Sequence, residues 1–205
     1  MKILTWDLET TGLNPDDDQI VEVGFCMSDG FEIIEESGCL VQPTIEIPYQ
    51  VTKIHGITTE EARTKGFKWD RVAERFTKKL YEADAWCGYN LDFDIRFLKA
   101  GLNNIGVEYE ERPVIDIFKI ARRFIPSDVI KKKSLSNMCS KMGIQLTNAH
   151  RAMHDASATI KLGEEVLKMV EVTLEEAIDG DFKKLGKYNI GKDQFEAMYS
   201  GFTSQ

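Results

Sequence analysis

Two acidic residues, Asp7 and Glu9, stand one residue apart at the end of a predicted strand. Residues 2–9 form an apolar run that closes on charged residues, and side chains alternate along a strand, so both carboxylates point to the same face. At about 4 Å, two such charges repel each other by about 4 kcal/mol at an effective dielectric of 20. A divalent cation would remove that cost. Because an isolated Asp-x-Glu is more often a solvated strand end, further acids are needed to indicate a metal site.

A third acid, Asp94, lies in the first turn of a helix predicted over residues 92–105, just after a strand predicted over residues 85–89. The positive end of the helix dipole favours a negative charge there. The alternative role for an acid at this point is helix capping, and Asp92 fits it better because it occupies the expected N-cap. We therefore expect Asp94 to face the ends of the strands.

Two of the three histidines, His150 and His154, precede a fourth acid, Asp155, which we expect to begin a long helix over residues 155–170. From the preceding loop, His150 can take a proton from a water that a metal ion has acidified. His154 has the same chemistry but is fixed directly beside Asp155. Together these residues indicate phosphodiester hydrolysis with two divalent ions, and their oxygen-rich ligands select Mg²⁺ or Mn²⁺ over zinc.

The elements that must position these residues predict an α/β protein. Strands are expected at residues 2–9, 19–27, 31–41, 85–89 and 113–117, and helices at 69–83, 92–105, 134–141 and 155–170. Strands first and βα units afterwards indicate a mixed sheet with helices on its faces. Asp116 is expected to cap the helix that follows it. We divide the chain into one domain at residues 1–172 and a C-terminal helical extension at residues 173–205.

Composition excludes several classes of protein. With 205 residues, 42% hydrophobic and 29% charged, the chain is neither disordered nor collagen-like. It has no apolar run near the ~18 residues of a membrane span and no signal peptide, so we expect a cytoplasmic protein. The four cysteines lack metal-site spacing and are expected to be reduced thiols. The net charge of −8 excludes a global basic field, but residues 119–133 carry six basic residues and one acid, 6 − 1 = +5. This segment is either a local phosphate-contacting patch or a solvated surface.

Taken in order, these motifs resemble those of a known family. Asp7-Leu-Glu9-Thr-Thr-Gly-Leu, Asn90-x-x-Phe93-Asp94 and His150-x-x-x-x-Asp155 resemble the three motifs of the DEDDh subgroup of DnaQ-like 3′→5′ exonucleases, and Ile54-His55-Gly56-Ile57-Thr58 resembles a further segment of these enzymes. The resemblance covers about residues 3–165 and is specific as an ordered set. It implies a ribonuclease H-like fold, with a five-stranded mixed sheet flanked by helices. It also implies an enzyme that releases nucleoside 5′-monophosphates from the 3′ end of single-stranded nucleic acid.

The resemblance also implies roles for individual residues. Asp7, Glu9 and Asp155 would hold the metal ion that carries the attacking water. Asp7 would bridge to a second ion, which Asp94 would hold partly through water. His150, rather than His154, would be the general base. The 3′-terminal nucleotide would lie against the remaining residues of the motifs, with Leu13 packing on its base: Thr10, Thr11, Gly12, Leu13, His55, Asn90 and Phe93.

Several alternatives stay open. DNA is the favoured substrate, but an exoribonuclease that trims RNA 3′ ends, or a proofreading subunit bound to a polymerase, fits the same motifs, and a homodimer is equally compatible. An inactive nucleic-acid-binding module on the same fold is the alternative of a different class, and the full set of five site residues argues against it. A phosphatase with Asp7 as nucleophile fits poorly, because that chemistry wants a second aspartate where Glu9 stands. Trp6, His154 and the segment from residue 173 depart from the family pattern.

Overall fold

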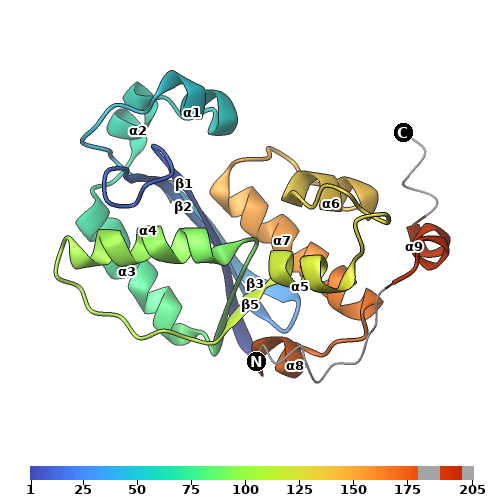
Figure 1. Ribbon diagram of the computed structural model, residues 1–205. Coiled ribbons are helices and arrows are strands. Elements are labelled where there is room, and N and C mark those ends of the chain that lie inside the picture. The colour runs from blue at the N-terminus through green and yellow to red at the C-terminus, as the bar shows by residue number, and fades with distance from the viewer. Residues whose placement is uncertain (180–189, 200–205) are drawn as a thin grey trace.

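A five-stranded mixed sheet forms the centre of the molecule (Figure 1), and the computed structural model describes residues 1–179 and 190–199. The strand order is β3-β2-β1-β4-β5. The central strand, β1, pairs antiparallel with β2 and parallel with β4, and β4 pairs parallel with β5. The strands are β1 (Lys2–Thr10), β2 (Ile20–Asp29), β3 (Glu32–Leu40), β4 (Ala85–Gly88) and β5 (Val114–Asp116). The predicted α/β class and five-stranded mixed sheet are confirmed.

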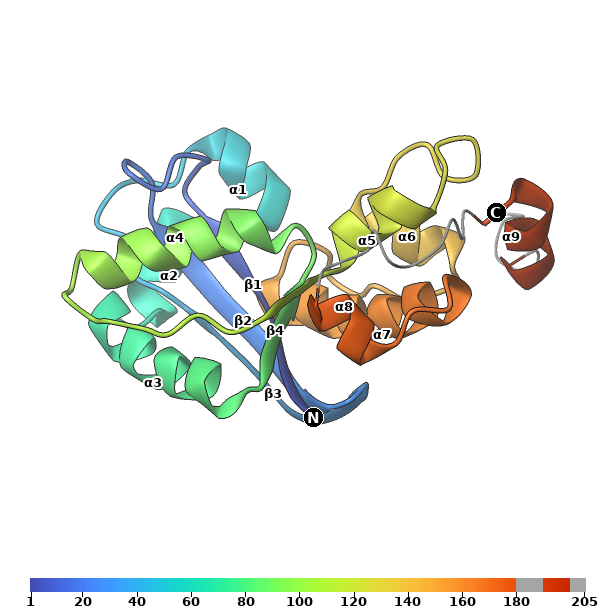
Figure 2. The same ribbon diagram turned by 60° about the horizontal axis from the view of Figure 1, so that its bottom comes forward.

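Helices cover both faces of this sheet, as Figure 2 shows. On one face, α3 (Trp69–Glu82) and α4 (Leu91–Asn103) pack on Leu4, Trp6 and Leu8 of the central strand. On the other face, α5 (Ile117–Phe124), α6 (Leu135–Lys141) and α7 (Ala152–Met169) form a core that includes Ile3. Because side chains alternate along β1, Asp7 and Glu9 share the face of Ile3, beneath α7.

Two short helices, α1 (Tyr49–His55) and α2 (Thr59–Lys65), were not predicted from the sequence. Each has only seven residues, which is too short for a clear helical periodicity. Local signals hold them instead. Gly56 ends α1 in a left-handed conformation at φ 76°, and the Thr58 hydroxyl caps α2 by accepting a hydrogen bond from the Glu61 N–H.

Two predicted helix starts are wrong and one predicted cap is confirmed. The last long helix, α7, begins at Ala152, so Asp155 lies inside its first turn. Asn90, at φ 66°, is the N-cap of α4, whereas Asp92 is exposed in the first turn and pairs with Lys119 at 2.7 Å. Asp116 does cap α5, because its side chain accepts hydrogen bonds from the N–H groups of residues 118 and 119.

The segment after residue 172 contains two described helices, α8 (Leu174–Asp179) and α9 (Lys192–Tyr199). Ala177 and Phe195 are buried in the same cluster as residues of α7. The division of the chain at residue 172 stays a prediction. Within the predicted extension, residues 180–189 and 200–205 lie outside the described residues. Among the helices described, none has the length and apolar character needed to span a membrane.

Candidate active site

The central strand presents the first two candidate residues, Asp7 and Glu9, near its C-terminal end. Asp7 lies opposite Gly24 of β2, and Glu9 lies opposite Glu22. Gly24 leaves no space for a side chain, since a Cβ there would lie 2.0 Å from the Met153 amide nitrogen. The start of α7 therefore rests directly on β2, next to the two acids.

Asp94 reaches the same place from the opposite helical layer. It is only 4% exposed, and its Oδ1 accepts a hydrogen bond of 3.0 Å from the Leu8 amide. Leu8 is the residue between the two strand acids. The first turn of α4 is thus tied to the backbone of β1 at the point where the carboxylates gather, as predicted for Asp94.

The loop before α7 brings in the remaining candidates. His150 has a positive φ of 62°, and its amide donates to both carboxylate oxygens of Asp155, at 3.3 and 3.2 Å. One possible ligand atom each from Glu9, His150 and Asp155 lies within 4.8 Å of the others. In the described part of the chain, His154 does not belong to that group. The structure therefore places His150, the histidine five positions before Asp155, among the acids.

Burial and the repulsion between neighbouring carboxylates both act on the two strand acids. Burial raises the pKa of Asp7 well above its ordinary value, and the carboxylates of Asp94 and Glu9 raise it further. Burial raises the pKa of Glu9 to about 8, with Asp155 as the next cause. Neither of these two side chains accepts a hydrogen bond within residues 1–179 and 190–199. Their oxygen atoms are therefore not engaged by hydrogen-bond donors there and can bind a cation.

Asp94 and Asp155 are more deeply buried than the half-buried Asp7 and Glu9, and each has a backbone donor. Burial raises the pKa of Asp94 to about 8, and the hydrogen bond from Leu8 opposes that effect. Burial raises the pKa of Asp155 to about 6, opposed by the nearby His150. Four acids with raised pKa values at one strand end form the kind of site at which perturbed groups gather for function.

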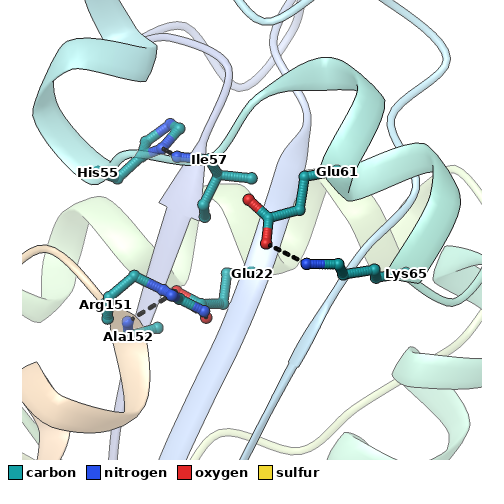
Figure 3. Close-up of polar contacts among 7 residues, drawn as sticks. All are labelled: Glu22, His55, Ile57, Glu61, Lys65, Arg151 and Ala152. Atoms are coloured by element: carbon teal, nitrogen blue, oxygen red, sulfur yellow. Dashed lines mark hydrogen bonds and ion pairs between the residues drawn. The ribbon is translucent and has the colours of Figure 1, made fainter.

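Glu22 and Arg151 lie beside the acids and were missed by sequence reasoning. Glu22 is 5% exposed, and the guanidinium of Arg151 contacts both of its carboxylate oxygens (Figure 3). The signal that could have found them is an acid buried in an otherwise apolar strand, together with an unassigned arginine next to the predicted base. A buried acid requires such a partner.

The residues predicted to contact the terminal nucleotide fall into two groups. In the turn after β1, the Thr10 hydroxyl donates to the Gly12 carbonyl at 2.6 Å, and the Thr11 hydroxyl donates to Asp18 at 2.9 Å. These hydroxyls shape the turn. Leu13 is 82% exposed at its tip, where an apolar side chain can pack on a base. The structure brings Leu13 to the surface, and its contact with a base stays a prediction.

The other predicted contacts come from three separate elements. His55, at the end of α1, is buried, and its Nδ1 accepts a hydrogen bond of 3.0 Å from the Ile57 amide (Figure 3). Burial lowers the pKa of His55, opposed by the backbone of Thr10 next to it. Asn90 is exposed at the N-cap of α4, and the half-buried Phe93 packs on Phe97 at 4.9 Å between ring centroids. Their contacts with a nucleotide stay predictions.

The sheet order, and the gathering of carboxylates at the end of its central strand, define an α/β protein of the ribonuclease H-like class. A model of the exonuclease family RNase_T matches residues 4–162, and the chain belongs to this DnaQ-like family. Membership implies a divalent metal ion. The oxygen atoms of Asp7 and Glu9, which accept no hydrogen bond from the described residues, fit such an ion.

The relatives of this chain are longer proteins. "DNA polymerase III PolC-type" of Bacillus cereus is 30% identical over 176 residues, which cover 86% of this chain and 12% of that protein. "3′-5′ exonuclease DinG" of Staphylococcus aureus is 31% identical over 156 residues, which cover 76% of this chain and 17% of that protein. The chain thus spans less than a fifth of the length of these two curated relatives.

Solved structures of Escherichia coli exonuclease I share the fold. A zinc-bound complex with single-stranded DNA matches with a TM-score of 0.74 and 23% identity, covering 89% of this chain and 43% of that one. A complex with a dT13 oligonucleotide matches with a TM-score of 0.68 and 21% identity, covering 81% and 41%. At these identities the likeness shows the fold alone.

We expect the metal-free protein to lose stability as the pH rises from about 5 to about 8. The pKa values of Glu9 and Asp94 are raised to about 8 in the folded state, from ordinary values of 4.5 and 3.8. The folded state therefore holds more protons than the unfolded state in this window, so the free energy of unfolding falls with pH. Thermal unfolding in a chelator measures this slope.

Mg²⁺ should raise the unfolding temperature more at about pH 8 than at about pH 5.5, because carboxylates bind metal in their deprotonated form. The variants Glu9→Gln and Asp94→Asn serve as controls and should each show a shallower pH slope without metal. A stability that rises with pH across the window, or an equal Mg²⁺ effect at both pH values, would contradict this electrostatic account.

Proposed function

We propose that this chain is a metal-dependent 3′→5′ exonuclease that releases nucleoside 5′-monophosphates from the 3′ end of single-stranded nucleic acid, with DNA favoured. The observation that carries the proposal is the convergence of Glu9, His150 and Asp155, together with Asp7 and Asp94, at one strand end of a DnaQ-family chain. A complex of exonuclease I with dT13 supports a single-stranded DNA substrate.

Asp7, Glu9, Asp94 and Asp155 would hold two divalent ions, Mg²⁺ or Mn²⁺. When bound, such ions supply positive charge that activates a water and stabilises the leaving 3′ oxygen. The protein must then accept the proton of that water. His150 carries an exposed imidazole beside Glu9 and Asp155, so its ring nitrogen is placed to take the proton as general base.

Two further roles are proposed for residues around this centre. The exposed Leu13 would pack on the terminal base, and the turn of residues 10–13 would line the terminal sugar. Similarity to the polymerase PolC supports a proofreading role as the alternative, with a polymerase as partner. RNA 3′-end trimming is the other alternative, since the two substrates differ at the 2′-hydroxyl that such a turn would contact.

A surface of basic and aromatic residues lies beside the site and has the chemistry to bind single-stranded nucleic acid. Lys119 is paired with Asp92, and Lys133 is held by the Ile130 carbonyl at 2.7 Å. Of the predicted basic patch, the exposed residues not held in this way are Arg122, Arg123, Lys131 and Lys132.

Aromatic rings connect this patch to the strand ends. Arg122 lies 5.5 Å from the ring of Phe118, and that ring lies 5.5 Å from the ring of Tyr89. Tyr89 directly precedes Asn90 at the end of β4. Half-exposed aromatic rings next to cations form a surface on which successive bases can stack while their phosphates are neutralised.

Mononucleotide release from a 3′ end tests the function. With Mg²⁺ the wild type should shorten a 5′-labelled single-stranded oligonucleotide one nucleotide at a time, and a chelator should stop it. Asp7→Asn should abolish nearly all release. His150→Ala should slow single-turnover cleavage by roughly 10²–10⁴-fold, the usual worth of a positioned base. His154→Ala, as the matched control, should cost far less.

Endonucleolytic products, or release that persists in a chelator, would count against the proposal. If His154→Ala loses the activity and His150→Ala keeps it, the assignment of the base is wrong. DNA and RNA oligonucleotides of one sequence, assayed side by side, decide the substrate class.

Removing three of the four exposed basic residues of the patch should weaken binding of all single-stranded sequences alike. The variant Arg122→Ala/Lys131→Ala/Lys132→Ala should flatten the dependence of log Kd on log salt by up to ~0.7 for each phosphate that the variant no longer neutralises. The control is Lys78→Ala/Lys168→Ala, which removes two exposed lysines elsewhere. Equal salt slopes for the two variants would show that the patch is only a solvated surface.

A further inference from the structure

We propose that Glu22, which is buried, and Arg151, which is partly exposed, form a clamp that sets the position of His150, so that both are positioning residues. This inference rests on the proposed function, because it assigns the residues that hold the proposed general base in place. Neither residue touches the reacting atoms in the proposal. They act through the backbone of residues 150–152.

The contacts converge on one carboxylate. Arg151 Nε donates to both oxygens of Glu22, at 3.1 and 3.2 Å, and Nη2 donates to Oε1 at 2.7 Å. The amide of Ala152 donates to Oε2 at 2.9 Å. The side chain of Glu22 is 6% exposed and that of Arg151 is 43% exposed. Figure 3 shows the guanidinium and the Ala152 amide meeting the carboxylate at the start of the helix.

Both ends of the segment that carries His150 are fixed by these bonds. Arg151 is the N-cap of α7 and Ala152 its first residue, so Glu22 binds the chain directly after His150. On the other side, the His150 amide is bound to Asp155. His150 itself has a φ of 62°, a conformation that a non-glycine residue keeps only where its surroundings impose it.

The strand beneath the clamp is shaped to receive the helix start. At Gly24, two residues after Glu22, a Cβ would lie 2.0 Å from the Met153 amide nitrogen and 2.2 Å from the Ala152 carbonyl carbon. This close backbone contact and the Glu22 carboxylate act on the same residues. Together they fix where α7 begins, and with it the point from which the His150 imidazole extends.

A purely stabilising contact would not need this chemistry. Glu22 adds a fifth carboxylate to an already crowded site, and a buried ion pair is often no more stabilising than well-packed apolar residues. What the pair provides is direction, because a planar guanidinium bound through two nitrogens holds a carboxylate in a single orientation. The exposed pair of Arg63 and Glu46, at 2.7 Å, lacks these features and serves as a matched control.

A double-mutant cycle with His150 tests the clamp. Arg151→Gln and Glu22→Gln should each lower kcat by about 10-fold or more and leave KM for the oligonucleotide within about twofold. In the His150→Ala background, either substitution should add less than about threefold, because a clamp that acts through His150 has nothing left to position. Arg151→Lys keeps the charge without the planar fork and should recover only part of kcat. Arg63→Gln should behave as wild type.

Amide hydrogen exchange on the metal-free protein gives a readout independent of activity. Peptides covering residues 148–155 should exchange faster in Arg151→Gln and Glu22→Gln than in wild type or Arg63→Gln, at temperatures where thermal unfolding shows every variant folded. If Arg151→Gln does not fold, Glu22→Gln and Arg151→Lys carry the comparison.

The clamp would be overturned if the reductions in kcat from the clamp variants and from His150→Ala multiply in the double variants. A change in KM alone, or unchanged hydrogen exchange in residues 148–155, would also overturn it. These results differ from a failure of the proposed function, in which the wild type itself releases no mononucleotides with Mg²⁺.

Discussion

The central constraint on this structure is the burial of several carboxylates at one end of β1. Each of these acids is costly to ionise away from water, and each raises the cost for its neighbours. The protein compensates only some of them. Asp94 and Asp155 accept backbone amides, and Glu22 accepts Arg151. Asp7 and Glu9 accept no hydrogen bond from the described residues. Positive charge near these two acids would lower the cost of ionising them, which fits the divalent cation that the family implies.

The topology explains how acids from distant parts of the chain meet. A parallel pairing of β1 with β4 places the C-terminal ends of both strands at one edge, so α4 starts beside the end of β1. The start of α7 packs against the same edge. It can do so because Gly24 of β2 has no side chain where the backbone of α7 contacts the strand. Two helix N-termini, whose dipoles favour negative charge, therefore point their first turns at the acids. Backbone geometry thus supplies part of the compensation that side chains do not.

Periodicity in the sequence is enough to predict the sheet, the order of its strands along the chain and the longer helices, since these elements bury continuous apolar faces. The acids of the site are predictable for a related reason: they stand where an apolar run ends. Local capping is harder to predict. Asp92 looks like a cap, but its carboxylate pairs with Lys119 across the surface, and Asn90 takes the cap position in a left-handed conformation. The Glu22 contact joins residues 129 positions apart, which no local pattern reveals.

The start of α7 gives His150 and His154 different backbone surroundings, which bears on the proposal that His150 is the base. Because the helix begins at Ala152, His154 lies within its first turn, and its backbone is set by helical geometry. His150 lies two residues before the helix, in a non-helical conformation. It can stand beside Glu9 and Asp155 only if the helix starts where it does. Glu22 binds the first helical amide, so the position of the proposed base would depend on a residue of the neighbouring strand. The crowded acids and the arginine that pairs with Glu22 thus form a single arrangement, in which the contact that neutralises Glu22 also fixes the loop that carries the imidazole.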